Sequence, residues 1–358
     1  TDAVRMLDAT LASAQKRPTI GICMGEAGVM TRILAKNIGG FLTFCSLDKG
    51  KESAPGQVTI EEMRTLYRWD KVMPKTKVYG VIGCPVGHSM SPAMHNAAFD
   101  QINHDGVYLP LLIEPAYDAF AAFIDACLEH SWLDLRGCSV TIPHKENLLR
   151  YVKQRGGDIE PLAERIGVAN TLAIDADRGV SACNTDYRGA IESLCQGLNC
   201  DTRALGGKSV CMLGSGGAAR GIVAGLKDVG AHVTIRSRRQ EPAVQLQRDF
   251  GADDWVSLAD VSPITQDIVI NCTPLGMHPN EDTCPLVAEQ MSKGCVVFDT
   301  VYNPFETKLL KMARDRGCVT IDGVHMLVNQ AAAQFKLWTG QDAPTDLMRR
   351  VVVDRLTR

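Results

Sequence analysis

Short runs rich in β-branched residues alternate with longer stretches of helical periodicity along almost the whole chain. The runs that predict strands span residues 19–24, 40–45, 78–83, 107–112, 138–142, 171–174, 209–213, 232–236, 268–272, 295–299 and 318–321. The stretches that predict helices span 3–16, 27–37, 59–68, 91–102, 116–129, 145–152, 187–196, 217–229, 242–250, 306–315 and 324–338. Alternation of this kind is typical of α/β folds with mostly parallel sheets.

The length of 358 residues suits at least two domains. A charged, Pro-containing stretch at 70–77 has no periodicity and predicts a linker after an N-terminal segment of about 75 residues. A polar, Gly-rich stretch at 197–208 precedes a strong strand pattern, which indicates a second boundary.

Composition excludes several classes of partner. The net charge is −3, which lacks the basic excess of a nucleic-acid-binding protein. Neither a membrane span of 18 apolar residues nor a signal peptide is present in the sequence, although the chain begins at Thr1 rather than Met. The thirteen cysteines are scattered without a C-x-x-C pair, so we expect reduced core residues, a cytoplasmic location and no metal site.

A glycine-rich loop follows the predicted strand 209–213 and precedes an apolar helix. The loop reads Gly214-Ser215-Gly216-Gly217-Ala218. At a strand-to-helix turn, glycines allow close approach to a pyrophosphate, and the helix N-terminus supplies free N–H donors. A simple Gly-rich turn is the alternative.

The end of the next strand predicts which nicotinamide nucleotide binds. An NAD site usually has a carboxylate here for the ribose 2′-hydroxyl, but this chain has Arg236, Ser237, Arg238 and Arg239. Guanidinium groups match the geometry and charge of a phosphate, so this turn predicts NADP. A solvated basic turn is the alternative.

Polar residues also follow the predicted strands 78–83 and 138–142. Ser89 and Ser91 can donate to a substrate carboxylate, although Ser91 before Pro92 is also typical of a helix N-terminus. Lys145 follows the second strand, where a surface lysine is the simplest interpretation. If the fold brought it to Asp186, the two would form a plausible acid–base pair.

Eight motifs occur in an order that resembles the shikimate dehydrogenase family over about residues 77–345. They are PVGHSMSP, TIPHK, GVANTL, NTDYRG, LGSGGAARG, NCTPLGM, VYNP and GVHMLVNQAAAQF. The resemblance implies a shikimate-binding α/β domain at 76–186, a Rossmann-type NADP domain at 187–320, and C-terminal helices at 321–358 that return to the substrate domain.

The same resemblance implies roles for individual residues. It makes Lys145 and Asp186 the catalytic pair. The substrate-binding residues it implies are Ser89, Ser91, Thr141, Asn170, Thr185, Tyr302 and Gln330. The cofactor-binding residues it implies are Gly214, Gly216, Gly217, Ala218, Arg236, Ser237, Arg238, Thr273 and Met277. Ser237 and Arg239 replace the Asn and Thr of the family's phosphate-binding turn.

Residues 1–75 resemble the end of a type I 3-dehydroquinate dehydratase, a (β/α)₈ barrel with a Schiff-base lysine. MGEAGVMTR at 24–32 and SAPGQ at 53–57 carry this resemblance, and Arg32, Ser53 and Gln57 match substrate-binding positions. We therefore expect an incomplete barrel segment without dehydratase activity. The upstream dehydratase portion would precede it, as in the bifunctional dehydratase–shikimate dehydrogenase fusions.

The sequence thus predicts NADP-dependent interconversion of 3-dehydroshikimate and shikimate. One alternative is the NAD-dependent quinate/shikimate branch of the family, against which the arginine cluster argues. Another is a cofactor-binding module without catalysis, against which Lys145 and Asp186 argue.

Overall fold

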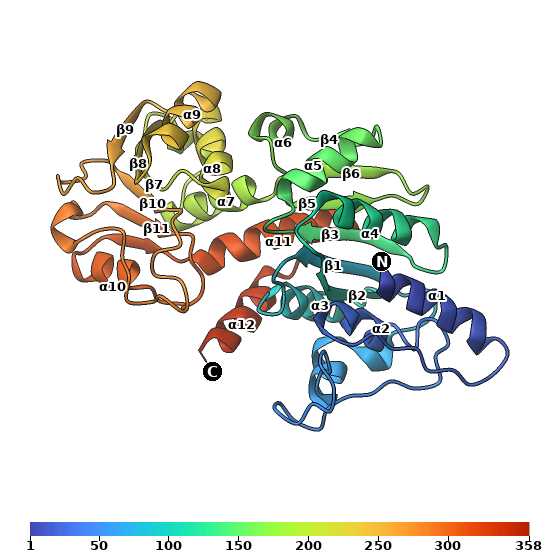
Figure 1. Ribbon diagram of the computed structural model, residues 1–358. Helices are drawn as coiled ribbons and strands as arrows, with labels where there is room; N and C mark the ends of the chain where they lie inside the picture. The colour runs from blue at the N-terminus through green and yellow to red at the C-terminus, as the bar shows by residue number, and fades with distance from the viewer. Residues whose placement is uncertain (358) are drawn as a thin grey trace. The chain divides into compact units, whose positions relative to one another are not determined.

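The computed structural model describes residues 1–357, which form two compact units, each built on a six-stranded sheet (Figure 1). Unit 1 contains Thr1–Glu160, Gly167–Cys183 and Gln334–Met348. Unit 2 contains Pro161–Ile166, Asn184–Ala333 and the chain from Arg349 onward. Residues 1–75 therefore cluster in the same unit as the segment that follows them.

The sheet of unit 1 has the strand order β2-β1-β3-β5-β6-β4. Its strands are β1 (Lys77–Gly83), β2 (Gly106–Leu112), β3 (Leu135–Val140), β4 (Asp158–Ile159), β5 (Thr171–Ile174) and β6 (Val180–Cys183). Strand β1 is parallel to β2 and β3, whereas β5 is antiparallel to both β3 and β6. The start of β5 therefore lies at the same sheet edge as the ends of β1 and β3.

Helices pack an aromatic core against this sheet. They are α3 (Ser91–Gln101), α4 (Tyr117–Glu129), α5 (Lys145–Gln154) and parts of α11 (Gly323–Thr339) and α12 (Thr345–Leu356). Tyr79, Phe99 and Phe335 are fully buried in this core. A Cβ atom on Gly137 would lie 2.1 Å from Nε1 of Trp338, so a glycine in β3 allows the end of α11 to approach the sheet.

The sheet of unit 2 has the order β12-β11-β10-β7-β8-β9 and is parallel throughout. Its strands are β7 (Ser209–Leu213), β8 (His232–Ser237), β9 (Asp254–Ser257), β10 (Ile268–Asn271), β11 (Val296–Asp299) and β12 (Val319–Ile321). Its helices include α6 (Pro161–Ile166), α7 (Asp186–Leu198), η4 (Thr202–Leu205), α8 (Gly217–Asp228), α9 (Gln240–Phe250), η5 (Ala288–Gln290) and α10 (Lys308–Asp315). The strand order reverses between β7 and β10, as in a Rossmann fold.

The expected α/β class and the Rossmann-type unit are therefore confirmed, and β5 and β7 have the predicted bounds. Four short elements were not expected from periodicity, namely β4, β6, β9 and α6, and α12 was also missed. Strands of two to four residues are too short to show an alternating pattern. Strand β3 ends at Val140 rather than residue 142, where the chain turns towards Pro143.

Two of the predicted strands are wrong. Residues 19–24 and 40–45 form no ladder, and the segment up to residue 75 contains α1 (Asp2–Ala14), η1 (Glu26–Gly28), α2 (Val29–Ile33), η2 (Glu62–Leu66) and η3 (Trp69–Lys71). One backbone bond from Phe41 N to Thr19 O (2.8 Å) joins the two stretches. Strands of a barrel need partners on both sides, and two βα units cannot supply them.

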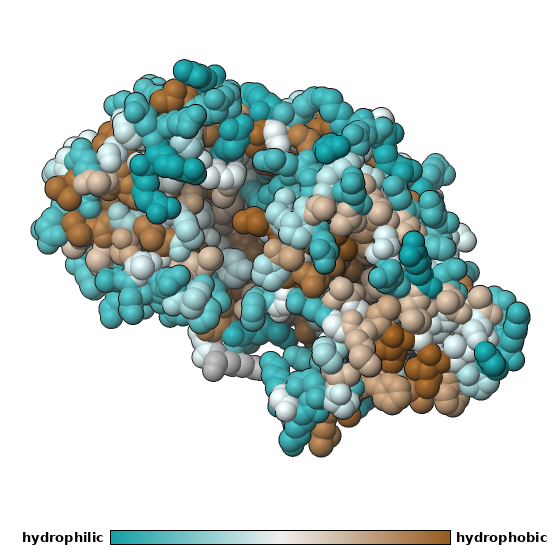
Figure 2. Space-filling view, viewed as in Figure 1, coloured by the Kyte–Doolittle hydropathy of each residue, from teal (hydrophilic) through white to brown (hydrophobic). Residues whose placement is uncertain are grey.

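Apolar side chains remain exposed in this N-terminal segment, and Figure 2 shows hydrophobic surface there. The exposed large apolar residues in it are Ile20, Met24, Phe41, Phe44, Leu47, Ile60 and Met73. Across residues 1–357, none of the helices is both long enough and apolar enough to cross a membrane.

Candidate functional site

The ends of β1 and β3 meet the start of β5 at one edge of the unit 1 sheet. Thr141 N donates to Ile82 O (2.9 Å), and Val140 N donates to Asn170 O (2.7 Å). This edge therefore brings together the loops that carry Ser89 and Ser91, Thr141 and Lys145, and Asn170. Ligands of open α/β sheets bind at the carboxyl ends of the strands, so this is the expected location for a substrate.

Lys145 is the first residue of α5 and is half-buried. Its backbone oxygen accepts a hydrogen bond from Ala169 N (3.1 Å), which ties the start of α5 to the loop before Asn170. A cation at a helix N-terminus opposes the helix dipole. The position of Lys145 is therefore unfavourable for the helix itself, which favours a chemical role over a purely structural one.

The preceding residue, His144, fixes the start of α5. Its buried imidazole donates from Nε2 to Ile113 O (3.0 Å), because a carbonyl can only accept. Nδ1 then accepts from Asn147 Nδ2 at 3.0 Å. His144 thus joins the helix to the residue after β2 and holds Lys145 at the sheet edge.

Ser89 and Ser91 lie at the N-terminus of α3, where Ser91 N donates to Ser89 Oγ at 3.2 Å. Ser91 is buried and Ser89 is half-buried. Two hydroxyl groups beside the N–H donors of a helix N-terminus suit a carboxylate.

Thr185, Asp186 and Gln330 belong to unit 2. Asp186 begins α7, where a carboxylate is favoured by the helix dipole, and its N–H donates to Asn184 Oδ1 (3.0 Å). Thr185 Oγ1 lies 3.5 Å from Oε1 of Gln330, so the structure brings together two of the predicted substrate residues.

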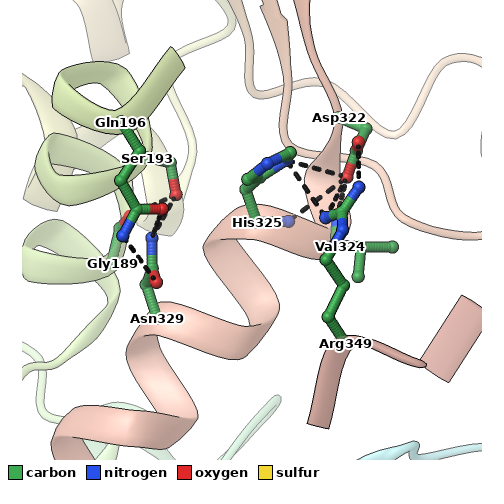
Figure 3. A network of polar contacts seen from close by, with 8 residues as sticks. All are labelled: Gly189, Ser193, Gln196, Asp322, Val324, His325, Asn329 and Arg349. Carbon is green, nitrogen blue, oxygen red and sulfur yellow. Dashed lines mark hydrogen bonds and ion pairs between the residues drawn. The ribbon is translucent and has the colours of Figure 1, made fainter. Parts of the chain in front are cut away.

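The contact between α7 and α11 depends on Gly189. A Cβ atom there would lie 2.8 Å from Gln330 N and 3.0 Å from Met326 O, closer than real Cβ atoms come. Beside it, Asn329 Nδ2 donates to Ser193 Oγ (3.0 Å) and Gln196 Oε1 (3.1 Å), as Figure 3 shows. These bonds fix the turn of α11 that carries Gln330.

The start of α11 is held by a second polar cluster, also drawn in Figure 3. Asp322 accepts from both guanidinium nitrogens of Arg349, at 3.2 and 2.9 Å, and contacts Nδ1 of His325 at 3.1 Å. Although burial opposes ionisation, these partners hold the pKa of Asp322 well below its usual range. This cluster joins α12 to the beginning of α11.

The glycine-rich loop of unit 2 has the geometry of a phosphate cradle. Gly214 has a φ of 104°, and its N–H donates to Arg236 O (2.7 Å) at the end of β8. Cβ atoms placed on Gly216 and Gly217 would meet no atom within 4 Å, so space lies open above the start of α8. Ala218 follows on the first turn of this helix. The loop therefore fits a dinucleotide pyrophosphate.

The basic turn differs from the expectation at Arg236. Arg236 is a buried β8 residue whose guanidinium donates to the backbone oxygens of Asp260 and Ser262, each at 3.2 Å. Ser237 is also buried, and its hydroxyl donates to Arg239 O (2.7 Å). Arg238 and Arg239 are exposed. Arg236 and Ser237 therefore shape the turn, whereas Arg238 and Arg239 can meet a phosphate.

The remaining predicted residues of unit 2 follow β10 and β11. Thr273 Oγ1 donates to Asn271 Oδ1 (2.7 Å), and Met277 is 46% exposed. Tyr302 lies in the loop after β11, and burial raises the pKa of its phenol. All three lie in loops at the carboxyl ends of their strands, the edge that also carries the glycine-rich loop.

A buried carboxyl group that sequence reasoning missed supports this edge. Asp299, at the end of β11, accepts from Asn271 Nδ2 (2.9 Å), Val301 N (3.0 Å) and Thr307 Oγ1 (2.7 Å). Burial outweighs these bonds and raises the pKa of Asp299 to about 6. Its position after an apolar strand was the one signal in the sequence. Asp299 holds both loops, because Asn271 also bonds Thr273.

The dehydratase-type residues are only partly brought together. Ser53 N and Oγ both donate to Gln57 Oε1, at 2.8 and 3.3 Å. Arg32 is buried in α2, where one guanidinium nitrogen donates to Phe44 O (3.3 Å) and burial lowers the pKa of the side chain.

A cleft of about 800 Å³ in unit 1 lies away from all of these residues. It is lined by residues at the starts of β1 and β3, including Lys77 and Arg136, and by the β5–β6 hairpin. Two further arginines of its wall, Arg155 and Arg178, are bound to Asp125 and to backbone oxygens after α4. Among residues 1–357, no group of three His, Cys, Asp or Glu side chains is placed to hold a metal ion.

An α/β unit with hydroxyl groups and a lysine at its sheet edge, together with a Rossmann unit, defines the class of nicotinamide-nucleotide-dependent oxidoreductases. The chain is 40% identical over 288 residues to a shikimate dehydrogenase (NADP⁺) of Methanosarcina acetivorans, which covers 78% of this chain and 99% of that protein. The chain therefore belongs to the shikimate dehydrogenase family of NADP-dependent oxidoreductases, as the motifs predict.

Sequence profiles, a longer relative and a solved structure agree with this assignment. Profiles of type I 3-dehydroquinase, the shikimate dehydrogenase substrate binding domain and the shikimate 5′-dehydrogenase C-terminal domain match residues 1–74, 81–172 and 323–353. A crystal structure of a shikimate dehydrogenase in complex with NADP⁺ aligns with a TM-score of 0.72 and 35% identity over 79% of this chain and 97% of that one.

The Arabidopsis thaliana bifunctional 3-dehydroquinate dehydratase/shikimate dehydrogenase, chloroplastic, is 39% identical over 98% of this chain. The chain spans 58% of the length of that relative.

We expect Asp299→Asn to change how stability depends on pH. Because the folded-state pKa of Asp299 is raised from 3.8 to about 6, its favourable contribution is fully present below the unfolded pKa and is lost as the pH rises through about 6. The free energy of unfolding of the wild type, relative to Asp299→Asn, should therefore fall by about 3 kcal/mol between pH 3.5 and pH 7.

Urea denaturation at a series of pH values measures this difference. Asp315→Asn, which alters an exposed carboxyl of α10, is the matched control and should show no such trend. A difference that stays constant with pH would contradict the assignment to Asp299.

Proposed function

We propose that the chain catalyses the reversible, NADP-dependent reduction of 3-dehydroshikimate to shikimate. The observation that carries the proposal is the set of polar side chains and the glycine-rich loop at the carboxyl ends of the strands, on the motifs of the family. Shikimate carries a carboxylate and several hydroxyl groups, and the residues at these strand ends are hydroxyls, amides, one lysine and one aspartate.

In this proposal, the substrate-binding residues divide by chemistry. Ser89 and Ser91 donate to the carboxylate from the start of α3, with help from Tyr302. The residues that bind the hydroxyl and carbonyl groups are Thr141, Asn170, Thr185 and Gln330. Their support is the edge geometry of unit 1 and the 3.5 Å contact between Thr185 and Gln330.

Lys145 and Asp186 act as the proton-transfer pair. During reduction, the ring ketone gains a proton at oxygen, and during oxidation the hydroxyl loses one. Lys145 exchanges this proton, and Asp186 supplies the negative charge that orients and balances the ammonium group.

NADPH supplies the hydride that reaches the ring carbon. Gly214, Gly216, Gly217 and Ala218 hold the pyrophosphate at the start of α8. Arg238, with Arg239 beside it, meets the 2′-phosphate, whereas Arg236 and Ser237 hold the turn from within. Thr273 and Met277 lie beside the nicotinamide.

An absorbance assay at 340 nm with shikimate or quinate, and with NADP or NAD, tests the proposal. Shikimate with NADP should give the fastest reduction of the nucleotide. A preference for NAD with quinate would instead support the quinate branch of the family. The absence of turnover with every combination would support a cofactor-binding module without catalysis.

Arg238→Ala should raise the KM for NADP by about tenfold or more and leave NAD turnover nearly unchanged. The reason is the loss of a charge-assisted contact with the 2′-phosphate, worth about 1.5–3 kcal/mol. Steady-state kinetics with each nucleotide measure the effect. Arg248→Ala, an exposed arginine of α9, removes the same charge elsewhere in unit 2 and should leave both KM values unchanged. Equal losses with both nucleotides would show a structural role.

Lys145→Ala should lower kcat by roughly 10²–10⁴-fold, the scale of a lost acid–base group. The double variant with Asp186→Asn should be little worse than the worse single variant, because groups that act as one unit are not additive. Lys153→Ala, an exposed lysine near the end of α5, is the control and should retain kcat. Losses that multiply in the double variant would show two independent roles.

Residues 1–75 represent the end of a dehydratase barrel in this proposal, and an upstream dehydratase portion is their partner. The exposed apolar residues of this segment, including Phe41 and Phe44, support such a partner because a complete barrel would bury them. We retain a cytoplasmic location as part of the proposal, because the cysteines suit a reducing compartment.

The chain as it stands should lack dehydratase activity. The chemistry needs a lysine amine that forms an imine with the substrate ketone, and a barrel wall that desolvates it. The lysines of the segment are Lys16, Lys36, Lys49, Lys51, Lys71 and Lys75. None of them lies in a strand, because residues 1–75 form no sheet strand. Borohydride treatment with 3-dehydroquinate should therefore leave the mass of the chain unchanged. A stable adduct on one of these lysines would overturn the prediction.

A further inference from the structure

A continuous set of buried side chains hydrogen-bonds through the interior of unit 1. We call it the buried polar network, and its members are Tyr108, Ser139, Gln334 and Thr171. The Tyr108 hydroxyl donates to Ser139 Oγ at 2.6 Å, and the Ser139 hydroxyl donates to Gln334 Oε1 at 2.7 Å. Gln334 Nε2 donates to Thr171 Oγ1 at 2.9 Å. The network joins β2, β3, α11 and β5.

The direction of these hydrogen bonds is set by a backbone carbonyl. Gln334 Nε2 also donates to Asn170 O at 3.4 Å, and a carbonyl can only accept. Nε2 of Gln334 therefore faces β5, and Oε1 faces Ser139. Since Thr171 Oγ1 accepts from Gln334, its own hydrogen is available for the next acceptor.

That acceptor is the side chain of Asn170. The Thr171 hydroxyl donates to Asn170 Oδ1 at 2.8 Å, and both residues are buried. An amide has one oxygen and one nitrogen end. With Oδ1 engaged by Thr171, Asn170 meets a ligand as a donor through Nδ2 rather than as an acceptor.

The other end of the network lies beside the proposed carboxylate-binding residues. Burial raises the pKa of Tyr108, so its phenol stays neutral and donates, and a further side-chain hydrogen bond links it to Ser91. Asn96 bonds the backbone of Tyr108 twice, at 2.9 and 2.8 Å. The His95 ring stacks on Tyr108 with centroids 4.5 Å apart. Tyr108 is thus held in one orientation.

We propose that the buried polar network is a positioning device that presents Asn170 Nδ2 as the donor to a substrate hydroxyl oxygen and couples this orientation to Ser91. The proposal rests on the proposed function, in which Ser91 and Asn170 bind opposite groups of shikimate. Apolar side chains could fill the same space without ordering an amide. A fully satisfied polar chain, by contrast, specifies one orientation. None of the network members is itself a catalytic residue.

Thr171→Val and Thr171→Ser form the central test. Valine matches threonine in shape and suits a strand, but it can neither accept from Gln334 nor donate to Asn170. We expect Thr171→Val to raise the Kd and KM for shikimate about 3- to 10-fold, the scale of one neutral hydrogen bond, with kcat and the KM for NADP nearly unchanged. Thr171→Ser keeps the hydroxyl and should stay within about twofold of the wild type.

A double-variant cycle separates positioning from general destabilisation. In an Asn170→Ala background, Thr171→Val should not weaken shikimate binding further, although its effect on Tm persists. The same fold-loss in both backgrounds would overturn the proposal, as would a Thr171→Ser variant as impaired as Thr171→Val. Gln334→Met, which is similar in length and apolar, should reproduce the result and replaces Thr171→Val if that variant does not fold.

Trp338→Phe is the matched control. It removes a hydrogen bond of 3.0 Å between α11 and β5, from Trp338 Nε1 to Leu172 O, outside the network. It should lower Tm without raising the Kd for shikimate; a rise equal to that of Thr171→Val would overturn the proposal. Titration calorimetry with shikimate measures Kd independently of turnover. A wild type that binds no shikimate would refute the proposed function, whereas a wild type that binds and variants that bind equally well would refute the positioning role alone.

Discussion

The antiparallel pairing of β3 with β5 is the constraint on which the proposed substrate site of unit 1 depends. Parallel neighbours of β1 and β3 would place their starts at the opposite edge, whereas β5 begins where β3 ends, with Ser139 opposite Thr171. Asn170 therefore lies beside Val140, joined by a 2.7 Å backbone bond. The same register brings Ser139 and Thr171 to the two ends of the Gln334 amide. One pairing thus determines both the edge that carries Lys145 and the polar interior behind it.

The sequence predicted those parts of the fold whose signals are local. The bounds of β7 and the glycine-rich turn follow from an apolar run directly before Gly214, and the structure agrees with both. The three arginines after β8 looked equivalent, yet Arg236 is buried while Arg238 is exposed. What separates them is a loop about 25 residues downstream, whose backbone oxygens bind Arg236. Contacts between segments that far apart leave no trace in the local pattern.

The failed strands at 19–24 and 40–45 show the same limit from the opposite side. Their composition suits strands, and one backbone bond from Phe41 to Thr19 shows that the two stretches meet. Strand formation, however, needs a row of paired N–H and C=O groups along the segment. Without neighbours to supply it, Ile20 and Phe41 stay exposed and the backbone forms no ladder. Periodicity therefore measured the capacity to pair, and the availability of partners decided the outcome.

The helix termini distinguish the two ionisable residues of the proposed catalytic pair. Asp186 and Lys145 each occupy the first position of a helix, α7 and α5. The helix dipole stabilises a negative charge there by about 0.3–1 kcal/mol and destabilises a positive one by a similar amount. The fold thus supports a permanent carboxylate at Asp186, while it favours the uncharged state of Lys145 over the charged one. A group whose charged form gains nothing from its helix is the better suited of the two to give up and regain a proton. This difference supports Lys145 as the residue that exchanges the proton and Asp186 as the fixed charge beside it.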